Sequence, residues 1–244
     1  EQQTDAQTAD TTGESGKDEE SSAEAASGNY GDKTIGFVGM TLNNEYHITL
    51  ANGAKVEAEA KGVKIEVQAG DQHASADAQL GIIENMIANK VDGILLSAIN
   101  ITDEHREIIR NSPVPLVVLA QDYDDGICVV YDDYGAGKAM GTWVGRGHPD
   151  RVGYMGVDES DEAVGITRKK GVLEGLKACG VECIREISGD YSYESGIRMA
   201  QELLDQGPLD AVICATDRLA FGAYRVLEGR GLRIPEDVSV AGFG

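Results

Sequence analysis

The stretch Lys33–Ser97 decides the fold: it reads KTIGFVGMTLNNEYHITLANGAKVEAEAKGVKIEVQAGDQHASADAQLGIIENMIANKVDGILLS. Three short apolar runs in it predict strands, at Ile35–Gly39, Val63–Gln68 and Asp92–Ser97. Two intervening segments have apolar side chains at helical spacing, Ile48–Lys61 and Ala76–Asn89. Strands that alternate with helices of this length predict βαβ units and a parallel sheet.

The same alternation continues to the end of the chain. Further strands are predicted over Val114–Leu119, Ile127–Tyr131, Arg151–Val157, Glu182–Ile187, Ala211–Ala215 and Val238–Ala241. Further helices are predicted over Thr102–Arg110, Gly137–Arg146, Ala163–Ala178, Glu194–Gln206 and Arg218–Arg230. A break near Tyr131–Gly135 divides the series, so we expect an α/β protein with two similar doubly wound lobes, residues 33–132 and 133–244. A ligand would then bind in the cleft between them, at the carboxyl ends of the strands.

Residues 1–32 differ in composition from the rest of the chain. They hold nine acidic residues against one base, Lys17, and Tyr30 is the one large apolar side chain. Such a segment buries too little apolar surface to offset the entropy of ordering it. We therefore expect a disordered acidic tether.

Charge and cysteine content narrow the classes of function. The net charge of −21 opposes direct binding of this segment to nucleic acid. The cysteines, Cys128, Cys179, Cys183 and Cys214, lack the spacing of a zinc site, so no metal is expected, and they slightly favour a reducing compartment. No apolar run is long enough to span a membrane.

The loop after the first strand carries the side chains that sugar sites use. Thr41–His47 reads TLNNEYH, in which amides offer donors and acceptors and Tyr46 offers an aromatic face. The alternative is an Asn-rich turn with Tyr46 packed at a helix start. The residues alone leave these two interpretations equal.

Further polar residues follow the strands of the second half. Arg168 could hold paired hydroxyls or an anion, or belong to a solvated face. Either Asp132 or Asp133 is expected to cap the helix that follows. The stretches with Tyr191 and with Thr216 and Asp217 also come directly after strands; His105 and His148 are expected in turns or surface helices.

Motifs of catalysis and cofactor binding are absent from the sequence. It has no GxGxxG after a strand, no P-loop, no GxSxG and no HExxH. No catalytic residue and no cofactor are therefore expected, and binding is favoured over an enzyme.

The two halves of the chain resemble two known protein families. Lys33–Ile99, with its TLNN loop and later IENMI and VDGI segments, resembles the ribose-binding proteins of ABC transporters. The later half, with VVYDDYGAGKAMG, GHPDRVGYMGV, ATDRLAFGA and IPEDVSVAGFG, resembles the effector-binding core of LacI/GalR regulators, most of all the trehalose repressor. Both families have the type I periplasmic-binding-protein fold, so the resemblance implies that fold.

The resemblance also implies ligand-binding positions. Those carried over from the ribose-binding pattern are Asn44, Tyr46, His47, Arg168, Tyr191 and Thr216, with Asp217 beside it. Gln121 and Asp132, which follow strands in the first half, are added as candidate ligand-binding residues. Two departures argue against ribose itself: Ala120-Gln121 replaces an Asp-Arg pair, and Gly244 replaces an Asp. A different monosaccharide or a disaccharide is implied. The family's chain continues beyond this point, so we expect a C-terminally incomplete fragment that is less stable than the complete protein.

Two functions are compatible with these residues. The first is the sugar-binding component of an ABC importer, an extracytoplasmic lipoprotein or periplasmic protein that presents its sugar to a permease; the acidic leader favours it. The second is the cytoplasmic effector core of a LacI/GalR-type regulator, with a DNA-binding module attached. A doubly wound enzyme is the least favoured reading. Oligomeric state and the identity of the sugar are left open.

Overall fold

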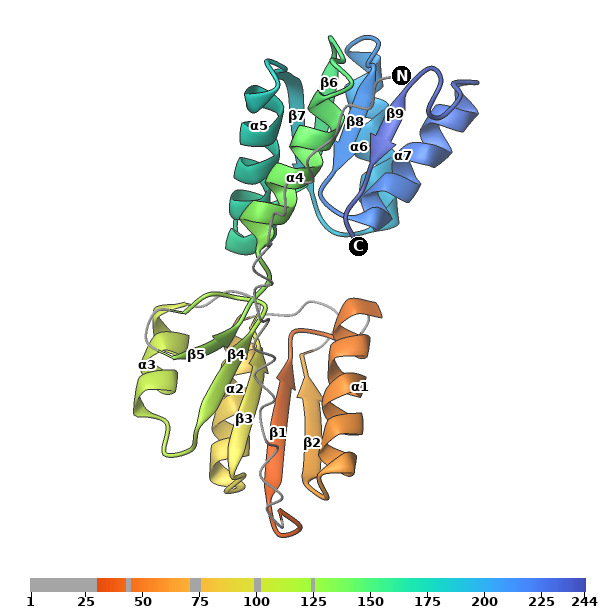
Figure 1. Cartoon of the computed structure of the whole chain (residues 1–244). Coiled ribbons are helices and arrows are strands. Elements are labelled where there is room, and N and C mark those ends of the chain that lie inside the picture. The colour runs from red at the N-terminus through yellow and green to blue at the C-terminus, as the bar shows by residue number, and fades with distance from the viewer. Residues whose placement is uncertain (1–29, 43–44, 71–75, 99–101, 124–125) are drawn as a thin grey trace, which may run out of the picture.

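The computed structural model describes residues 30–42, 45–70, 76–98, 102–123 and 126–244, and shows two α/β lobes (Figure 1). The predicted tether lies outside these ranges except for residues 30–32. The two-lobed parallel α/β architecture predicted from the sequence is confirmed. The predicted boundary between residues 132 and 133 remains a prediction.

The N-terminal lobe is built on a five-stranded parallel sheet in the order β2-β1-β3-β4-β5. Its strands are β1 (Thr34–Gly39), β2 (Lys64–Ala69), β3 (Gly93–Ser97), β4 (Leu116–Leu119) and β5 (Ile127–Val129). Its helices are α1 (Glu45–Ala60), α2 (Ala76–Ala88) and α3 (Asp103–Asn111). Because the strand order reverses beside β1, the carboxyl ends of β1 and β3 border a crevice suited to a ligand.

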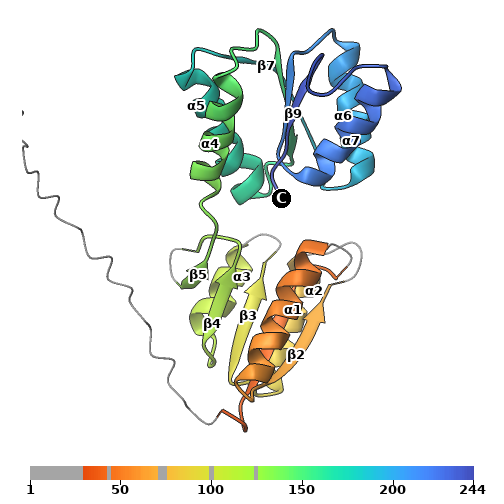
Figure 2. The ribbon, with the colours of Figure 1, turned by 45° about the vertical axis from the view of Figure 1, so that its right-hand side comes forward.

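The C-terminal lobe has a four-stranded parallel sheet in the order β7-β6-β8-β9. Its strands are β6 (Val152–Val157), β7 (Cys183–Gly189), β8 (Ala211–Cys214) and β9 (Ser239–Ala241). Its helices are α4 (Asp133–Gly145), the π-helix η1 (Glu162–Arg168), α5 (Lys169–Ala178), α6 (Tyr193–Asp205) and α7 (Asp217–Gly229). Figure 2 shows the sheet lying between the α4/α5 pair and the α6/α7 pair.

Each lobe has its own hydrophobic core. The N-terminal core includes Val38, Ile83, Met86, Ile94 and Leu96, each at most 2% exposed. The C-terminal core includes Tyr154, Met155, Leu176, Met199 and Ile213, all fully buried. Separate cores mean that the lobes share few apolar contacts, which leaves the space between them available to a ligand.

Helices α4 and α5 pack against each other through glycines. A Cβ atom at Gly141 would lie 2.1 Å from the carbonyl oxygen of Val172, and one at Gly175 would lie 2.3 Å from that of Lys138. Only glycine allows the two backbones to approach so closely. This close contact fixes the position of α4, and with it the residues at its amino end.

The structure corrects three sequence-based boundaries. Helix α1 begins at Glu45 instead of Ile48, and α4 begins at Asp133 instead of Gly137. Both first turns lack the apolar periodicity that predicts a helix, but the helix dipole favours the acidic residues Glu45 and Asp133 there, and Asp132 caps α4. The predicted helix Ala163–Ala178 is divided into η1 and α5. Helix α3 lies on the surface as predicted, but His105 is fully buried.

Candidate functional site

Three rings gather on the N-terminal lobe at the end that faces the other lobe. The rings of Tyr46 and His47, in the first turn of α1, are 5.0 Å apart and meet edge to face. Tyr46 lies 6.3 Å from the ring of Tyr131, and its hydroxyl donates a hydrogen bond to the Tyr131 hydroxyl over 3.4 Å. Burial, followed by this hydrogen bond, raises the pKa of Tyr46, so the phenol stays neutral. Partly exposed aromatic faces of this kind can stack on a sugar ring.

His47 is the most polar member of this group. Its Nδ1 is buried and has no hydrogen-bond partner. Burial lowers the pKa of His47, although the negative charge of Asp161 acts in the opposite direction. The imidazole is therefore neutral at pH 7.

Arg168 is the centre of the polar residues on the C-terminal lobe. Its Nε and Nη2 donate to Asp133 Oδ1 over 2.8 Å and 2.5 Å, and its Nη1 donates to the carbonyl oxygen of Ala215 over 2.8 Å. Its guanidinium carbon lies 4.4 Å from the ring centre of Phe243. A guanidinium has five N–H groups, so three hydrogen bonds leave two for a ligand.

Four elements meet at this arginine. It ends η1, Asp133 begins α4, Ala215 follows β8 and Phe243 follows β9. The predicted binding role of Arg168 gains a structural basis, because the guanidinium is buried and oriented instead of lying on a solvated face. A widened π-helical turn often marks a functional position.

Asp161 and Tyr191 form a second polar pair beside Arg168. The Tyr191 hydroxyl donates to Asp161 Oδ2 over 2.6 Å, and the backbone N–H of Val164 donates to Asp161 Oδ1 over 3.0 Å. Asp161 thereby caps η1. Burial, followed by the charge of Asp161, raises the pKa of Tyr191, so its hydroxyl remains a donor. Tyr191 was predicted as a ligand-binding residue, and the structure gives its hydroxyl a partner within the protein.

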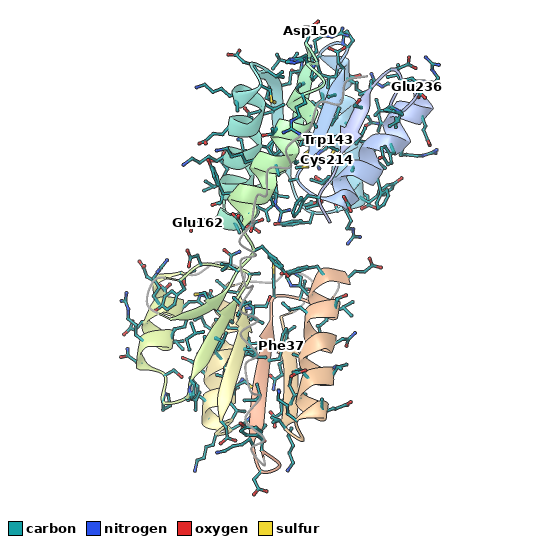
Figure 3. All side chains as sticks on the ribbon, in the orientation of Figure 1. Phe37, Trp143, Asp150, Glu162, Cys214 and Glu236 are labelled. Atoms are coloured by element: carbon teal, nitrogen blue, oxygen red, sulfur yellow. The ribbon has the colours of Figure 1, made fainter. Side chains whose placement is uncertain are left out.

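A small cavity lies between the two lobes and contains the predicted residue Gln121. Its volume is about 160 Å³, and it is lined by Ala120, Gln121, Asp122, Val130, Tyr131, Asp133, Glu162, Ala163 and Thr167. The first five come from the N-terminal lobe and the last three from η1. Figure 3 shows Glu162 at the end of the C-terminal lobe that faces the other lobe. The cavity therefore joins the Tyr131 side of the site to the Arg168 side.

Of the other predicted residues, Asp132 and Thr216 cap helices, Asp217 begins α7, and Asn44 is not among the described residues. Asp132 Oδ1 accepts from the backbone N–H of Gly135 over 2.8 Å, so Asp132, not Asp133, is the cap of α4. Thr216 caps α7 by accepting from the Leu219 N–H, and the backbone N–H of Asp217 donates to the carbonyl of Phe243. Asn44 lies outside the described residues.

The sequence reasoning missed Asp133, Asp161, Tyr131 and Phe243 as site residues. The sequence predicted Asp133 only as one of two possible caps of the following helix. Asp161 stands directly before a helical segment, which is a capping signal, but nothing in its spacing indicates that Tyr191 lies beside it. Phe243 is the penultimate residue of the sequence, and only the parallel alignment of β9 with β8 brings it to Arg168.

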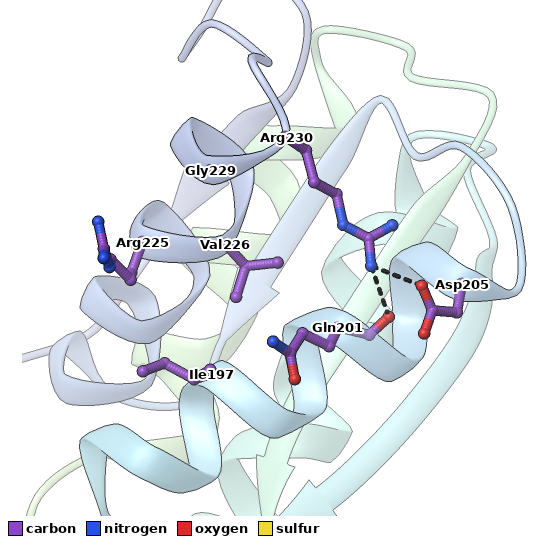
Figure 4. Close-up of a pocket in the computed structure, with 7 residues that line it drawn as sticks. All are labelled: Ile197, Gln201, Asp205, Arg225, Val226, Gly229 and Arg230. Atoms are coloured by element: carbon purple, nitrogen blue, oxygen red, sulfur yellow. Dashed lines mark hydrogen bonds and ion pairs between the residues drawn. The ribbon is translucent and has the colours of Figure 1, made fainter.

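A larger groove on the C-terminal lobe lies between helices α6 and α7, away from the strand ends (Figure 4). Its volume is about 530 Å³, and it is lined by Ile197, Gln201, Asp205, Arg225, Val226, Gly229 and Arg230. The guanidinium of Arg230 already binds Asp205 and the Gln201 carbonyl. We therefore place the candidate site between the lobes and not in this groove.

The described ranges hold no cluster of three or more His, Cys, Asp or Glu side chains that could bind a metal ion. Within the same ranges, no helix has the length and apolar content needed to cross a membrane.

The chain matches a family model, curated relatives and solved structures. A family model described as periplasmic binding protein domain matches residues 35–244. The sucrose operon repressor of Staphylococcus xylosus is 35% identical over 60% of this chain and 46% of its own length. Catabolite control protein A of Priestia megaterium is 31% identical over 86% of this chain and 64% of its own length. The chain thus spans about half to two thirds of these relatives. A periplasmic solute-binding protein of an ABC transporter from Actinobacillus succinogenes, solved with D-allose, has a TM-score of 0.79 at 23% identity, covering 86% of this chain and 78% of its own.

Proposed function

This chain belongs to the periplasmic binding protein domain family, and we propose that it binds a sugar without catalysis and acts as the effector core of a transcriptional regulator. The sugar would lie between Tyr46 and His47 on one lobe and Arg168 and Tyr191 on the other. The observation that carries this proposal is the two-sided arrangement itself. The N-terminal lobe provides paired aromatic faces, and the C-terminal lobe provides a buried, oriented guanidinium with two N–H groups left for a ligand.

The choice of a regulator rests on the relatives. Two of the matching proteins are named as a repressor and a control protein, and each is longer than this chain. DNA binding would then belong to another part of the complete protein, because the net charge of −21 opposes it here. Closure of the lobes on the sugar would change the affinity of that part for DNA, and the protein would be cytoplasmic.

The second candidate is a solute-binding receptor that delivers sugar to an ABC permease. The composition of residues 1–32 favours it, because nine acids and one base are unsuited to a segment that contacts DNA. The coding sequence on the 5′ side of Glu1 separates the two candidates. A helix-turn-helix followed by a basic hinge would support the regulator, whereas a signal sequence ending in a lipid-modified Cys would support the receptor.

Calorimetric titration with D-allose, D-glucose, D-ribose, sucrose and trehalose tests sugar binding by the wild-type chain. Tyr46→Ala should weaken binding at least ~10-fold, because it removes an aromatic face from the site. Tyr224→Ala is the matched control: Tyr224 also makes an edge-to-face pair, with Phe221 at 6.3 Å, but lies on α7 outside the site. Absence of heat with every sugar, or equal losses in both variants, would contradict the proposal.

A further inference from the structure

Helix α2 buries one polar side chain against the N-terminal lobe. Its buried residues are Gln79, Ile83 and Met86, and the last two belong to the N-terminal core. Gln79 is fully buried. Burying a side-chain amide costs free energy unless the amide is hydrogen-bonded, so the partners of Gln79 indicate why an amide stands at this position.

Gln79 joins the ends of two neighbouring strands. Its Nε2 donates to the carbonyl oxygen of Gly39 over 3.2 Å and to that of Ser97 over 2.9 Å. Gly39 is the last residue of β1, and Ser97 is the last residue of β3. The register between these strands ends one residue earlier, at Val38 and Leu96. Gln79 therefore holds β1 and β3 together at the point where their own pairing stops.

The two bonded carbonyl groups lie in the interior of the lobe. Gly39 is buried, and Ser97 is 1% exposed. A buried carbonyl group that loses its donor is costly, because water has little access to replace it. Without the amide of Gln79, the two strand ends would have to shift in order to find other donors.

The strand ends that Gln79 joins lead into the candidate site. They border the crevice at which the strand order of the sheet reverses. From Gly39 the chain runs to the first turn of α1, which carries Tyr46 and His47. A shift at the end of β1 would therefore move the two rings that lie on this side of the site.

We propose that Gln79 is a positioning residue for sugar binding. It fixes the spacing between the ends of β1 and β3, and thereby the place of Tyr46 and His47, without itself touching the sugar. The expected effect on affinity rests on the proposed function, whereas the expected effect on the two rings is independent of any ligand.

The first test compares Gln79→Met with Ile83→Ala in the whole chain. Methionine has nearly the size of glutamine but no N–H group, whereas Ile83→Ala weakens the packing of the same helix and leaves the strand-end bonds in place. Gln79→Met should weaken binding of the tightest-binding sugar of the panel about 10-fold, and Ile83→Ala less than about twofold. Urea unfolding of both variants measures how much stability each has lost, and the titrations are made where both are folded.

The second test needs no sugar. In nuclear magnetic resonance spectra of the sugar-free chain, the ring signals of Tyr46 and His47 should be displaced by Gln79→Met and unchanged by Ile83→Ala. In wild type, the side-chain amide protons of Gln79 should exchange slowly with solvent, and those of the exposed Gln201 rapidly. This exchange measurement applies even if Gln79→Met does not fold.

Three results would overturn the positioning role: equal losses of affinity in the two variants at equal losses of stability, ring signals that Gln79→Met leaves in place, or rapid exchange of the Gln79 amide in wild type. If wild type binds no sugar of the panel, the proposed function fails. The ring signals then decide by themselves whether Gln79 positions Tyr46 and His47.

Discussion

Arg168 and Asp133 form a buried ion pair in which Nε and Nη2 of the arginine both donate to a single carboxylate oxygen, over 2.8 Å and 2.5 Å. Their side chains are 9% and 7% exposed. The pair joins the end of η1 to the beginning of α4, directly after the chain leaves the N-terminal lobe. It therefore orients the candidate sugar-binding guanidinium and stabilises the lobe at the same place.

Asp133→Asn should destabilise the protein by about 3–5 kcal/mol, because it leaves the charge of Arg168 buried without a counterion. The double variant Asp133→Leu/Arg168→Met should recover much of this loss, since no charge is then buried. Lys61→Met removes the exposed pair Glu57–Lys61 and serves as the control, with an expected change below about 0.5 kcal/mol. Urea unfolding measures all three. A change in Asp133→Asn as small as that of the control would show that the pair contributes little.

Gly141→Ala should destabilise the C-terminal lobe by about 1–3 kcal/mol or more, because the new methyl group would overlap the Val172 carbonyl oxygen at 2.1 Å and force α4 and α5 apart. Gly53→Ala is the matched control, since Gly53 also lies inside a helix but has nothing within 4 Å of its Cβ position. That change should stabilise α1 by about 0.5–1 kcal/mol. Thermal unfolding of the two variants should shift in opposite directions; shifts of the same sign would contradict the packing argument.

His47 should make the stability of the protein depend on pH below about 6.5. Burial lowers the pKa of His47 below its usual value of 6.5, so the unfolded chain takes up the proton more readily than the folded chain. Stability is therefore complete above pH 6.5 and falls as the pH drops through the window below it. His47→Phe should lose less free energy of unfolding than wild type between pH 7.5 and 5.5.

His105 requires its own comparison, because burial lowers its pKa in the same direction. It is present in both wild type and His47→Phe, so its contribution cancels from the difference between them. Urea titrations at four pH values measure that difference. Parallel pH profiles for the two proteins would mean that His47 is solvated in the folded state.

Two cysteines should resist alkylation in the folded protein. Burial raises the pKa of Cys183 to about 11 and that of the fully buried Cys214 further still. Only about one Cys183 thiol in a thousand is ionised at pH 8, and the thiolate is the reactive form. At pH 8, iodoacetamide labelling with peptide mapping should show appreciable modification of both only after unfolding in urea. Below pH 11, labelling of Cys183 should rise about tenfold per pH unit while Cys214 stays unmodified; rapid labelling of Cys214 at pH 8 would contradict its burial.

The succession of strands and helices could be predicted from the sequence because it depends on local pattern. Apolar runs such as Ile35–Gly39 and helical periodicity such as that of Ala76–Asn89 give nearly the bounds of β1 and α2. The errors fall where polar residues begin a helix, at Glu45 and at Asp133. At Asp133 the stabilisation comes from the Asp132 cap and the helix dipole, and at Glu45 it comes from the helix dipole. Apolar periodicity registers neither effect.

The candidate site was predictable only in part. Arg168, Tyr46, His47 and Tyr191 were carried over from a resemblance, and the structure brings all four to the side where the lobes face each other. Asp132 and Thr216 instead satisfy the free N–H groups of helix ends. Sequence spacing cannot distinguish a capping side chain from a binding one, because both follow a strand and both are polar.

By itself the sequence determined the parallel α/β architecture, its division into two series of strands, and the end of each sheet where a ligand would bind. These follow from periodicity and from the geometry of βαβ units, which are local. Only the tertiary structure decided that Arg168 pairs with Asp133, that Phe243 lies on its guanidinium, and that Tyr46 bonds to Tyr131. Those partners are separated by 35 to 85 residues along the chain, and they meet only because strand pairing and close helix packing bring distant segments to one place.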